Sequence, residues 1–381
     1  MDFSLPPHVE ALRDEVRKFA EKEIRPHIME WDEHKTFPMA VMKQLGAMGL
    51  MGVIFPEEYG GAGMGYLEYA VIVEELSRVD GSVGISIAAH NSLCANHIYA
   101  MGNEAQRRKY LVPLASGQVV GAWGLTESEA GSDAGALRTV GRKEGSHWVL
   151  NGSKTFITHG TVGEICVVMA RTRPGKGADG ISAFILEKGM NGFRPGKQEN
   201  KLGLRASDTS ELILEDVKVP EENMLGDEGV GFKQAMSTLD GGRISIAALG
   251  LGMAQGAFEA SVKYAKERHT FGKPLIEHQA IGFKLADMQV EIEAARLLIQ
   301  KAAYLKDAHL PYGKAASLAK LYSSEVGCRV ADEAIQIHGG YGYIKDYPVE
   351  KFYRDVKLCT IGEGTSEVQR MVIARYLMRE F

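Results

Sequence analysis

The chain of 381 residues carries 44 Lys and Arg against 49 Asp and Glu, a formal net charge of −5, and 45% of its residues are hydrophobic. This length fits two or three domains with a sizeable core, and the absence of any block of like charge argues against a binder of nucleic acid or anionic membranes. The four cysteines form no CxxC pair and the histidines show no metal-ligand spacing, so we expect reduced thiols and no metal site.

The N-terminal segment has no apolar signal core and mixes acidic with basic residues. The longest apolar runs are shorter than a membrane span. We therefore expect a cytoplasmic protein without membrane association, and a processed mitochondrial protein stays open as the alternative.

The first part of the chain has a helical period. Val9, Leu12 and Val16 fall on one helical face. The same period continues through residues 42–50, 67–76 and 105–111. These patterns predict an N-terminal α-helical domain over residues 1–118.

Near Val119 the pattern changes to short β-rich runs separated by turn clusters. Runs at 147–150 and 154–158 are joined through Asn151-Gly152, a strong hairpin signal. Further strands are expected at residues 165–170, 181–186 and 211–219. This spacing predicts a compact antiparallel sheet or barrel, so we assign a middle β-barrel-like domain to residues 119–230.

The helical period returns in three long stretches, 231–267, 276–308 and 312–337, and a last helix is expected to start near Ser366. We predict a C-terminal four-helix bundle over residues 231–381. The fold class is thus α+β and multidomain, without the alternating βαβ order of a parallel sheet.

One acidic residue near the end of the chain, Glu363, lies between glycines in the segment 361–366. Glycine allows close approach of backbone to a ligand, and the following Thr365-Ser366 pair can cap a helix. A carboxylate held there could act as a general base. An exposed acid in an ordinary loop explains the segment equally well.

Other glycine-rich segments have competing explanations. Gly61–Gly65 fails as a nicotinamide dinucleotide site because Tyr66 occupies the place of the next required glycine, so we expect a surface turn. Gly124–Asp133 follows a strand and suits a phosphate or a flat polar ring, although a capped turn fits as well. Gln336–Gly342 has more glycines than a helix C-cap needs, which favours approach of a ligand.

Over essentially its whole length the chain resembles the acyl-CoA dehydrogenases. Several separated motifs agree with that family in order and spacing, namely residues 56–61, 124–136, 239–243, 268–272, 336–355 and 363–365. The resemblance implies that FAD binds between the β domain and the C-terminal bundle, with a thioester acyl chain against the flavin ring.

The resemblance also assigns cofactor contacts by position. The flavin ring is expected against Trp123, Gly124, Leu125, Thr126, Phe156, Ile157 and Thr158. The diphosphate and adenosine parts are expected against Arg268, Thr270, Gln279, Gln336, Ile337, His338, Gly339 and Gly340. Thr365, Ser366 and Glu367 are expected to flank FAD. Some of these contacts cross a subunit interface in the family, which implies a homotetramer. His338 is expected to pack near the helix end rather than to act as an acid or base.

For the substrate, the resemblance places Ser132, Asp240, Arg243 and Gly364 against acyl-CoA. Glu363 matches the base that removes the α-proton while a β-hydride passes to flavin N5, giving a trans-2-enoyl-CoA. A free glutamate is a weak base for this task, so we expect the apolar acyl chain, as it closes over Glu363, to desolvate the carboxyl group and raise its pKa. Electron-transferring flavoprotein is the implied electron acceptor.

Two departures from the family pattern concern the base and the acyl pocket. Some branches carry the base at the position of Gly242, where this chain has no carboxylate. Many relatives have tyrosine where this chain has Gly362, so we expect a short- to medium-chain or branched substrate rather than a strict butyryl preference. The rival functions are an oxidase that uses oxygen and a non-catalytic acyl-CoA-binding scaffold.

Overall fold

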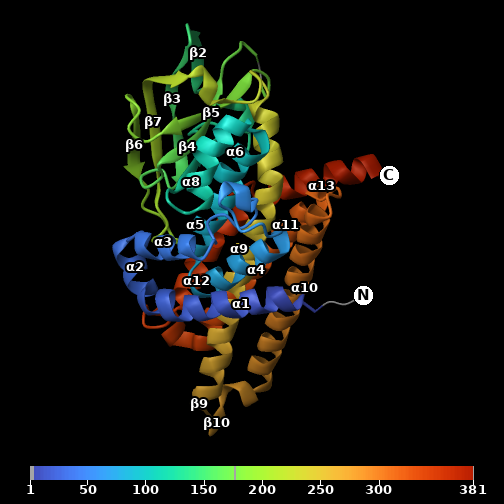
Figure 1. The fold of residues 1–381 in the computed structure, drawn as a ribbon. Helices are drawn as coiled ribbons and strands as arrows, with labels where there is room; N and C mark the ends of the chain where they lie inside the picture. The colour runs from blue at the N-terminus through green and yellow to red at the C-terminus, as the bar shows by residue number, and fades with distance from the viewer. Residues whose placement is uncertain (1–3, 176, 381) are drawn as a thin grey trace.

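The computed structural model of this protein describes residues 4–175 and 177–380 (Figure 1). Its first part is helical, as predicted. The helices are α1 (Pro7–Phe19), α2 (Ile28–His34), α3 (Met39–Ala47), α4 (Tyr66–Val79), α5 (Gly81–Ala89), α6 (Asn96–Met101), α7 (Glu104–Gln106) and α8 (Val112–Ala115). Short π-helical turns, such as His90–Ala95 between α5 and α6, continue several of them.

The middle part is a β domain. Its strands are β1 (Gly121–Gly124), β2 (Val140–Glu144), β3 (His147–Thr158), β4 (Ile165–Arg171), β5 (Ile181–Glu187), β6 (Phe193–Gln198), β7 (Thr209–Pro220) and β8 (Met224–Leu225). They form one sheet of order β6-β7-β3-β2-β4-β5-β8, with β1 added beside β4. Most pairs are antiparallel, while β1 and β2 each pair with β4 in parallel. The predicted middle β domain is confirmed, and its sheet is mixed rather than purely antiparallel.

The hairpin predicted at Asn151-Gly152 is wrong. Both predicted runs belong to the single strand β3, which pairs with β7 along its length, and the dipeptide is the site of a register shift. Asn151 exchanges two hydrogen bonds with Asp216 of β7, each 2.9 Å long. Gly152 has φ +149°, and an added Cβ would lie 2.5 Å from Thr139 Oγ1. Glycine is therefore needed here for a β-bulge and a close contact, not for a turn.

The C-terminal part contains the three long helices expected, α9 (Gly231–Glu267), α10 (Gln279–Asp307) and α11 (Gly313–His338), and the last helix α13 (Ser366–Glu380). A further helix, α12 (Val349–Val356), was not predicted. The short strands β9 (His269–Thr270) and β10 (Lys273–Pro274) join α9 to α10. In Figure 1 they lie at the opposite end of the molecule from the β domain.

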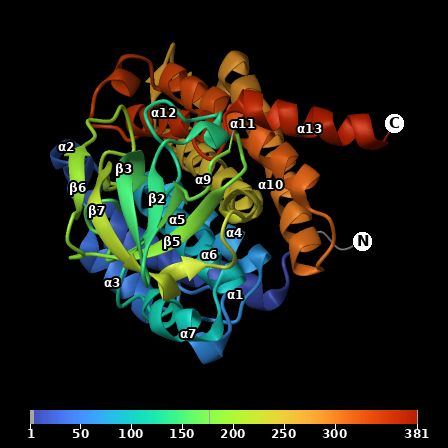
Figure 2. The same cartoon turned by 90° about the horizontal axis from the view of Figure 1, so that it is seen from above.

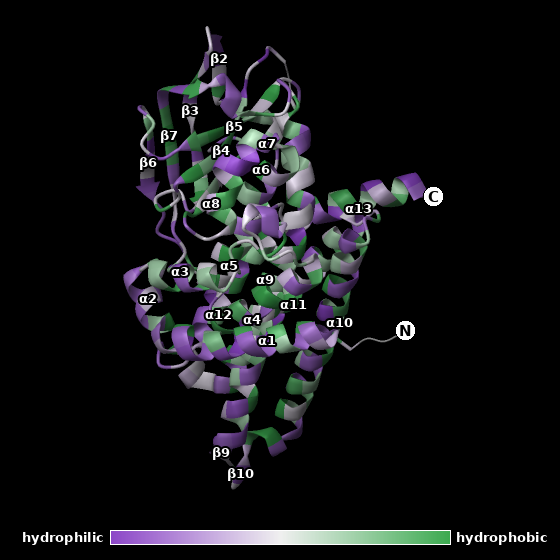
Figure 3. Cartoon of the chain, viewed as in Figure 1, coloured by the Kyte–Doolittle hydropathy of each residue, from purple (hydrophilic) through white to green (hydrophobic). Residues whose placement is uncertain are grey.

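One hydrophobic core joins the N-terminal helices to the C-terminal bundle. Ile72 of α4, Leu249 of α9 and Val326 of α11 are all fully buried in it. Figure 3 shows hydrophobic ribbon where α5, α9 and α11 meet, and Figure 2 shows the β domain beside these helices from above. The N-terminal helices and the C-terminal bundle therefore share one continuous core, and the β sheet lies on top of it in Figure 1.

The strands β4 and β5 are buried on both faces. One face, including Val167 and Ile185, packs against helices of the N-terminal part, and the other, including Val168 and Phe184, packs within the sheet domain. Burial on both faces explains why these strands are continuous apolar runs in the sequence.

Buried charges also join the parts of the chain. Lys351 of α12 lies 2.7 Å from Asp80 Oδ1 and 2.5 Å from Asp355 Oδ2, and all three side chains are buried. Asp355 Oδ1 accepts a hydrogen bond from the backbone amide of Leu204, in the β domain. Within residues 4–175 and 177–380, no helix is long and apolar enough to cross a membrane.

Candidate active site

Glu363 lies in a tight turn between the short helix Lys357–Thr360 and α13. Its φ is +51° and that of Gly364 is +93°, so the turn uses a conformation that residues other than glycine rarely adopt. Thr365 caps α13, since its Oγ1 accepts a hydrogen bond of 3.2 Å from the Val368 amide. The capping role expected for the Thr-Ser pair is thus carried by Thr365.

Two side chains donate hydrogen bonds to the backbone carbonyl groups of this turn. Lys320 of α11 donates to the Gly364 carbonyl over 2.7 Å. Gln369 of α13 donates to the same carbonyl over 3.0 Å and to the Glu363 carbonyl over 3.4 Å. Both side chains are fully buried. The strained turn is therefore fixed from two helices.

The Glu363 side chain is a shielded, unpaired carboxyl group. The residue as a whole is half-buried, but Oε2 is closed off from solvent and has no hydrogen-bond partner among the described residues. Burial raises the pKa of Glu363 to about 7, against the opposing effect of the positive charges of Lys320 and Arg243. A carboxyl group with this pKa can take up a proton near neutral pH.

Helices α4 and α9 form the walls beside this carboxyl group. A Cβ built at Gly242 of α9 would lie 2.1 Å from Glu363 Oε2, so any side chain there would collide with it. Ser245 Oγ donates to the Gly242 carbonyl over 2.8 Å. Burial raises the pKa of Tyr69 on α4, and the negative charge of Glu363 raises it further.

Of the residues predicted to contact acyl-CoA, three are near this turn and one is elsewhere. Arg243, which is buried, forms an ion pair with Asp240 and lies 3.5 Å from Ser317 Oγ. Gly364 is part of the turn itself. Ser132 is exposed in the loop that follows β1, on the β domain.

The two segments predicted to contact the flavin ring lie side by side. Trp123 and Gly124 end β1, Leu125 and Thr126 follow it, and Phe156, Ile157 and Thr158 end β3. The Thr155 amide donates to the Thr126 carbonyl over 2.9 Å. Lys154 Nζ donates to the Leu125 carbonyl over 3.2 Å and to Glu127 Oε1 over 2.6 Å.

The residues present here fit a flat aromatic group. Phe156 sits at a register shift of β3 with φ +59°, and 66% of it is exposed. Thr126 and Thr158 are half-buried as residues. An exposed apolar ring beside hydroxyl groups suits a planar ligand with a polar edge.

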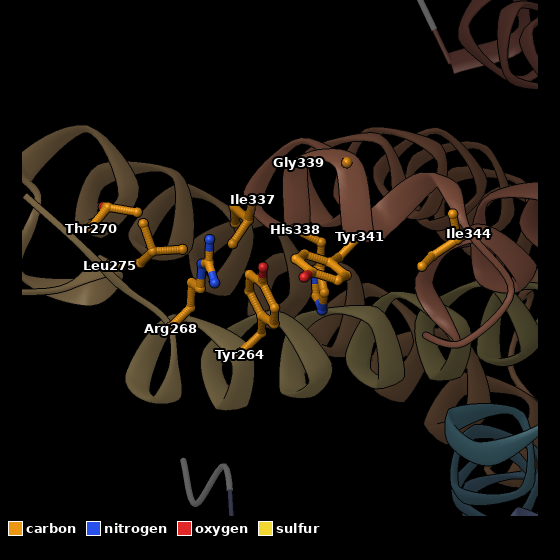
Figure 4. A pocket seen from close by; sticks show the side chains of 10 residues that line it. Tyr264, Arg268, Thr270, Leu275, Ile337, His338, Gly339, Tyr341 and Ile344 are labelled. Atoms are coloured by element: carbon orange, nitrogen blue, oxygen red, sulfur yellow. The ribbon is translucent and has the colours of Figure 1, made fainter.

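The residues predicted to contact the remainder of FAD gather in two other places. A pocket of about 490 Å³ is lined by Arg268, Thr270, Ile337, His338, Gly339 and Gly340, among others (Figure 4). A second pocket, of about 500 Å³, includes Thr365, Ser366 and Glu367 in its lining. Gln279 and Gln336 are exposed and line neither pocket.

Inside the first pocket the glycines leave open space. A Cβ added at Gly339 or Gly340 would meet no atom within 4 Å, and Gly339 has φ +59°. His338 packs as expected, since its ring stacks on Tyr264 at 4.3 Å and its Nδ1 lies 2.8 Å from the Ala334 carbonyl. Burial lowers the pKa of His338. This pocket can therefore admit an elongated ligand beside Arg268.

Several residues that shape the site were not found from the sequence. Lys154, Glu127 and Lys320 are buried in the structure, although such residue types are usually exposed. His97, also buried, accepts a hydrogen bond of 3.0 Å from Trp123 Nε1. No motif or spacing marks Lys154, Lys320 or His97, and nothing within the segment 124–133 distinguishes Glu127, because their partners are far away in the sequence. In the described part of the chain, no group of three or more His, Cys, Asp or Glu residues could hold a metal ion.

Comparison with known families agrees with this architecture. The N-terminal, middle and C-terminal domain models of acyl-CoA dehydrogenase match residues 6–118, 122–217 and 229–378, respectively. The chain therefore belongs to the acyl-CoA dehydrogenase family, a class of flavin-dependent oxidoreductases.

Individual relatives are similar over all or nearly all of their length. The short-chain specific acyl-CoA dehydrogenase of Clostridium acetobutylicum is 54% identical over 379 residues, covering 100% of both chains. A chain in the solved structure of the electron transferring flavoprotein of Acidaminococcus fermentans has a TM-score of 0.98 and 50% identity, with 100% of both chains covered. A glutaryl-CoA dehydrogenase of Mycobacterium smegmatis, solved in complex with FADH2, has a TM-score of 0.93 and 32% identity, with 98% of this chain and 95% of that chain covered.

Proposed function

We propose that this enzyme oxidises a short- to medium-chain or branched acyl-CoA to the trans-2-enoyl-CoA, with Glu363 as the base. The observation that carries this proposal is the shielded, unpaired Oε2 of Glu363, whose pKa burial raises to about 7. FAD, when bound, supplies the acceptor for the hydride that leaves the β-carbon. Glu363 Oε2 takes the α-proton, so one proton and one hydride leave the substrate together.

The backbone of the same turn can assist this step. The Glu363 amide has no hydrogen-bond acceptor among the described residues. It is thus available to the thioester oxygen, which gains negative charge as the α-proton leaves. Such a donor typically contributes about 100- to 1,000-fold to a rate.

The test is Glu363→Gln, which keeps the shape of the side chain and removes the base. The variant should fold, retain FAD and bind acyl-CoA, while the flavin absorbance stays unbleached when substrate is added. Normal bleaching would overturn the assignment of the base. For the wild type, kcat/KM should rise with pH through about 7, because the reaction needs the ionised carboxylate.

The acyl range follows from similarity and from one substitution. The relative that is specific for short chains supports a short substrate. A Cβ added at Gly362 would have its nearest neighbours at 3.6 Å, in Leu358, so this position has room for a side chain. Many relatives have tyrosine there, and in this chain the room is left empty. Rates across straight and branched acyl-CoAs test this range, and a sharp optimum at long chains would contradict it.

We propose that FAD lies between copies of the chain in a homotetramer. The predicted flavin-ring residues are on the β domain, whereas the pocket around Arg268 is near β9, at the other end of the molecule (Figure 1). A second copy could bring the two groups together. In support, α10 exposes an apolar stripe with a seven-residue repeat, Phe283, Val290, Leu297 and Tyr304, each between 45% and 68% exposed.

The assembly is tested with Leu297→Glu, which puts a charge in the middle of this stripe. Analytical ultracentrifugation should show a tetramer for the wild type and smaller species with less bound FAD for the variant. Lys218→Glu, on an exposed position of β7 in the β domain and away from α10, is the control and should stay tetrameric. A monomeric wild type that binds FAD normally would contradict the proposal.

We further propose that electron-transferring flavoprotein accepts the electrons, supported by the similar chain whose solved structure is described as that of an electron transferring flavoprotein. The alternative is direct use of oxygen. Reduced, product-bound enzyme should react with oxygen slowly and with electron-transferring flavoprotein rapidly, and the reverse order would indicate an oxidase.

The domain bounds 1–118, 119–230 and 231–381 and a cytoplasmic location also stay proposals. The start of β1 at Gly121 and of α9 at Gly231 supports the bounds. Limited proteolysis tests them, and cell fractionation tests the location.

A further inference from the structure

Lys320 is an unusual residue in this fold because its ammonium group is buried without a carboxylate partner. Its side chain is fully buried on α11. Its hydrogen bond goes to the Gly364 carbonyl, at 2.7 Å, and no ion pair within 4.0 Å joins it to an acid in the described part of the chain. Burial lowers the pKa of Lys320 to about 8, which shows how unfavourable this position is for the charge. A buried charge that is kept without an ion pair needs another explanation.

The groups around Lys320 indicate what the charge does. The turn that it holds contains Glu363, whose Oε2 has no hydrogen-bond partner. Two positive charges lower the pKa of this carboxyl group against the effect of burial, and that of Lys320 has a larger effect than that of Arg243 on α9. Tyr69 of α4 also faces Glu363, while Cys359 and Glu367 face Lys320.

We propose that Lys320 is the positioning residue for Glu363: it holds the Glu363–Gly364 turn through the Gly364 carbonyl and places a positive charge beside the carboxyl group. The role rests on the proposed function of Glu363 as the base. Without the ammonium group, the turn loses its hydrogen bond from α11, and the carboxylate loses the positive charge that most favours its ionised form. Lys320 thus increases the ionised fraction of the base near neutral pH, against the effect of burial.

The test compares Lys320→Met with Ser324→Ala in the FAD-loaded enzyme. Ser324 lies one turn further along α11 and donates to the Cys359 carbonyl over 2.8 Å, so its variant removes a buried hydrogen bond to the same loop without changing charge. The pH titration of the Glu363 carboxyl group is followed by difference infrared spectroscopy, with Glu363→Gln to identify the band. Lys320→Met should raise the pKa of Glu363 by about one unit or more, and Ser324→Ala should leave it unchanged.

Kinetics give the second readout. The rise of kcat/KM with pH should move to higher pH in Lys320→Met by the same amount, and kcat on the plateau should also fall because the turn is less well held. If Lys320→Met does not fold, Lys320→Gln serves instead, since it removes the charge and keeps a shorter donor. An unchanged Glu363 titration in either folded variant, or an equal shift in Ser324→Ala, would overturn the role of Lys320.

The infrared titration needs no turnover, so the two proposals can fail separately. A wild type that never oxidises acyl-CoA, but shows the shift in Lys320→Met, would refute the function and leave the control of the carboxyl group by Lys320 in place. An active wild type without the shift would refute Lys320 alone.

Discussion

The backbone of Gly242 lies against the carboxyl group of Glu363, so that a Cβ at position 242 would be 2.1 Å from Oε2. The two residues come from α9 and from the turn before α13, more than a hundred positions apart. They are also the two positions at which the resemblance places the base in different branches of the family. Because the two positions are in contact, a carboxylate on either element could reach the same place in the site. The contact also explains why position 242, beside the Glu363 carboxyl group, is a glycine.

The first prediction follows from this contact. Gly242→Ala would push the Glu363 carboxyl group away from its place, and displacement by about 1 Å can cost about 100-fold in rate. We expect kcat to fall by that order while FAD stays bound, as measured by steady-state kinetics and the flavin spectrum. Gly250→Ala on the same helix is the control, because its Cβ would lie 3.3 Å from Ser323 Oγ and 3.4 Å from the Ser323 carbonyl oxygen, a much smaller overlap than at Gly242. Full activity in Gly242→Ala would show that the carboxyl group has room to move.

A second prediction concerns stability and pH. Because the folded-state pKa of Glu363 is raised from 4.5 to about 7, the folded protein binds more protons than the unfolded chain between these values. The free energy of unfolding therefore falls as pH rises through this window. Glu363→Gln has no such dependence, so at pH 8 it should be more stable than the wild type by about 1–3 kcal/mol.

Thermal unfolding at pH 8 and at pH 5, with the same excess of FAD, measures this difference. The variant should show the higher apparent Tm at pH 8 and no advantage at pH 5, where the wild-type carboxyl group is already protonated. An equal advantage at both pH values would mean that the gain does not come from the buried charge.

The sequence predicted the helical and β parts because each has a clear local period. Gly152 shows where this local reasoning fails, since its neighbour Asn151 pairs with Asp216, and nothing nearby in the sequence reveals that partner. Glu363 was identified as a candidate from its flanking glycines and from the resemblance. Its raised pKa and the buried Lys320 beside it depend on packing between three helices, which no local pattern specifies.

A third prediction concerns the pair Lys154 and Glu127, which joins the two segments expected to contact the flavin. Lys154 is buried, and burial lowers its pKa to about 8 although Glu127 opposes this. Lys154→Met would leave the Glu127 carboxylate without its ammonium partner, which typically costs about 3–5 kcal/mol. Urea unfolding should show this loss, and FAD should dissociate more readily.

Lys143→Met is the matched control on the neighbouring strand. Lys143 pairs with Glu221 at the surface, where both side chains are about half exposed. Such pairs contribute at most about 1 kcal/mol, so the control should retain FAD and nearly all of its stability. Similar losses in the two variants would mean that the buried pair has no special role.

The last prediction concerns Lys351, which lies between Asp80 and Asp355 where the N-terminal part, the β domain and α12 meet. Lys351→Met would leave two buried carboxyl groups together, with an expected loss of about 3–5 kcal/mol at pH 8. Burial raises the pKa of Asp355, and Lys351 opposes this rise. In the variant that opposition is gone, so the folded state should take up a proton as pH falls.

The sign of the pH effect follows from proton uptake. A folded state that binds more protons than the unfolded chain gains stability as pH decreases, so the deficit of Lys351→Met should be smaller at pH 5.5 than at pH 8. Urea unfolding at both values measures it. Lys345→Met, which removes an exposed pair with Glu33, should lose at most about 1 kcal/mol and show no such dependence. A deficit of the same size at both pH values would mean that the cost comes from lost packing rather than from two unpaired carboxylates.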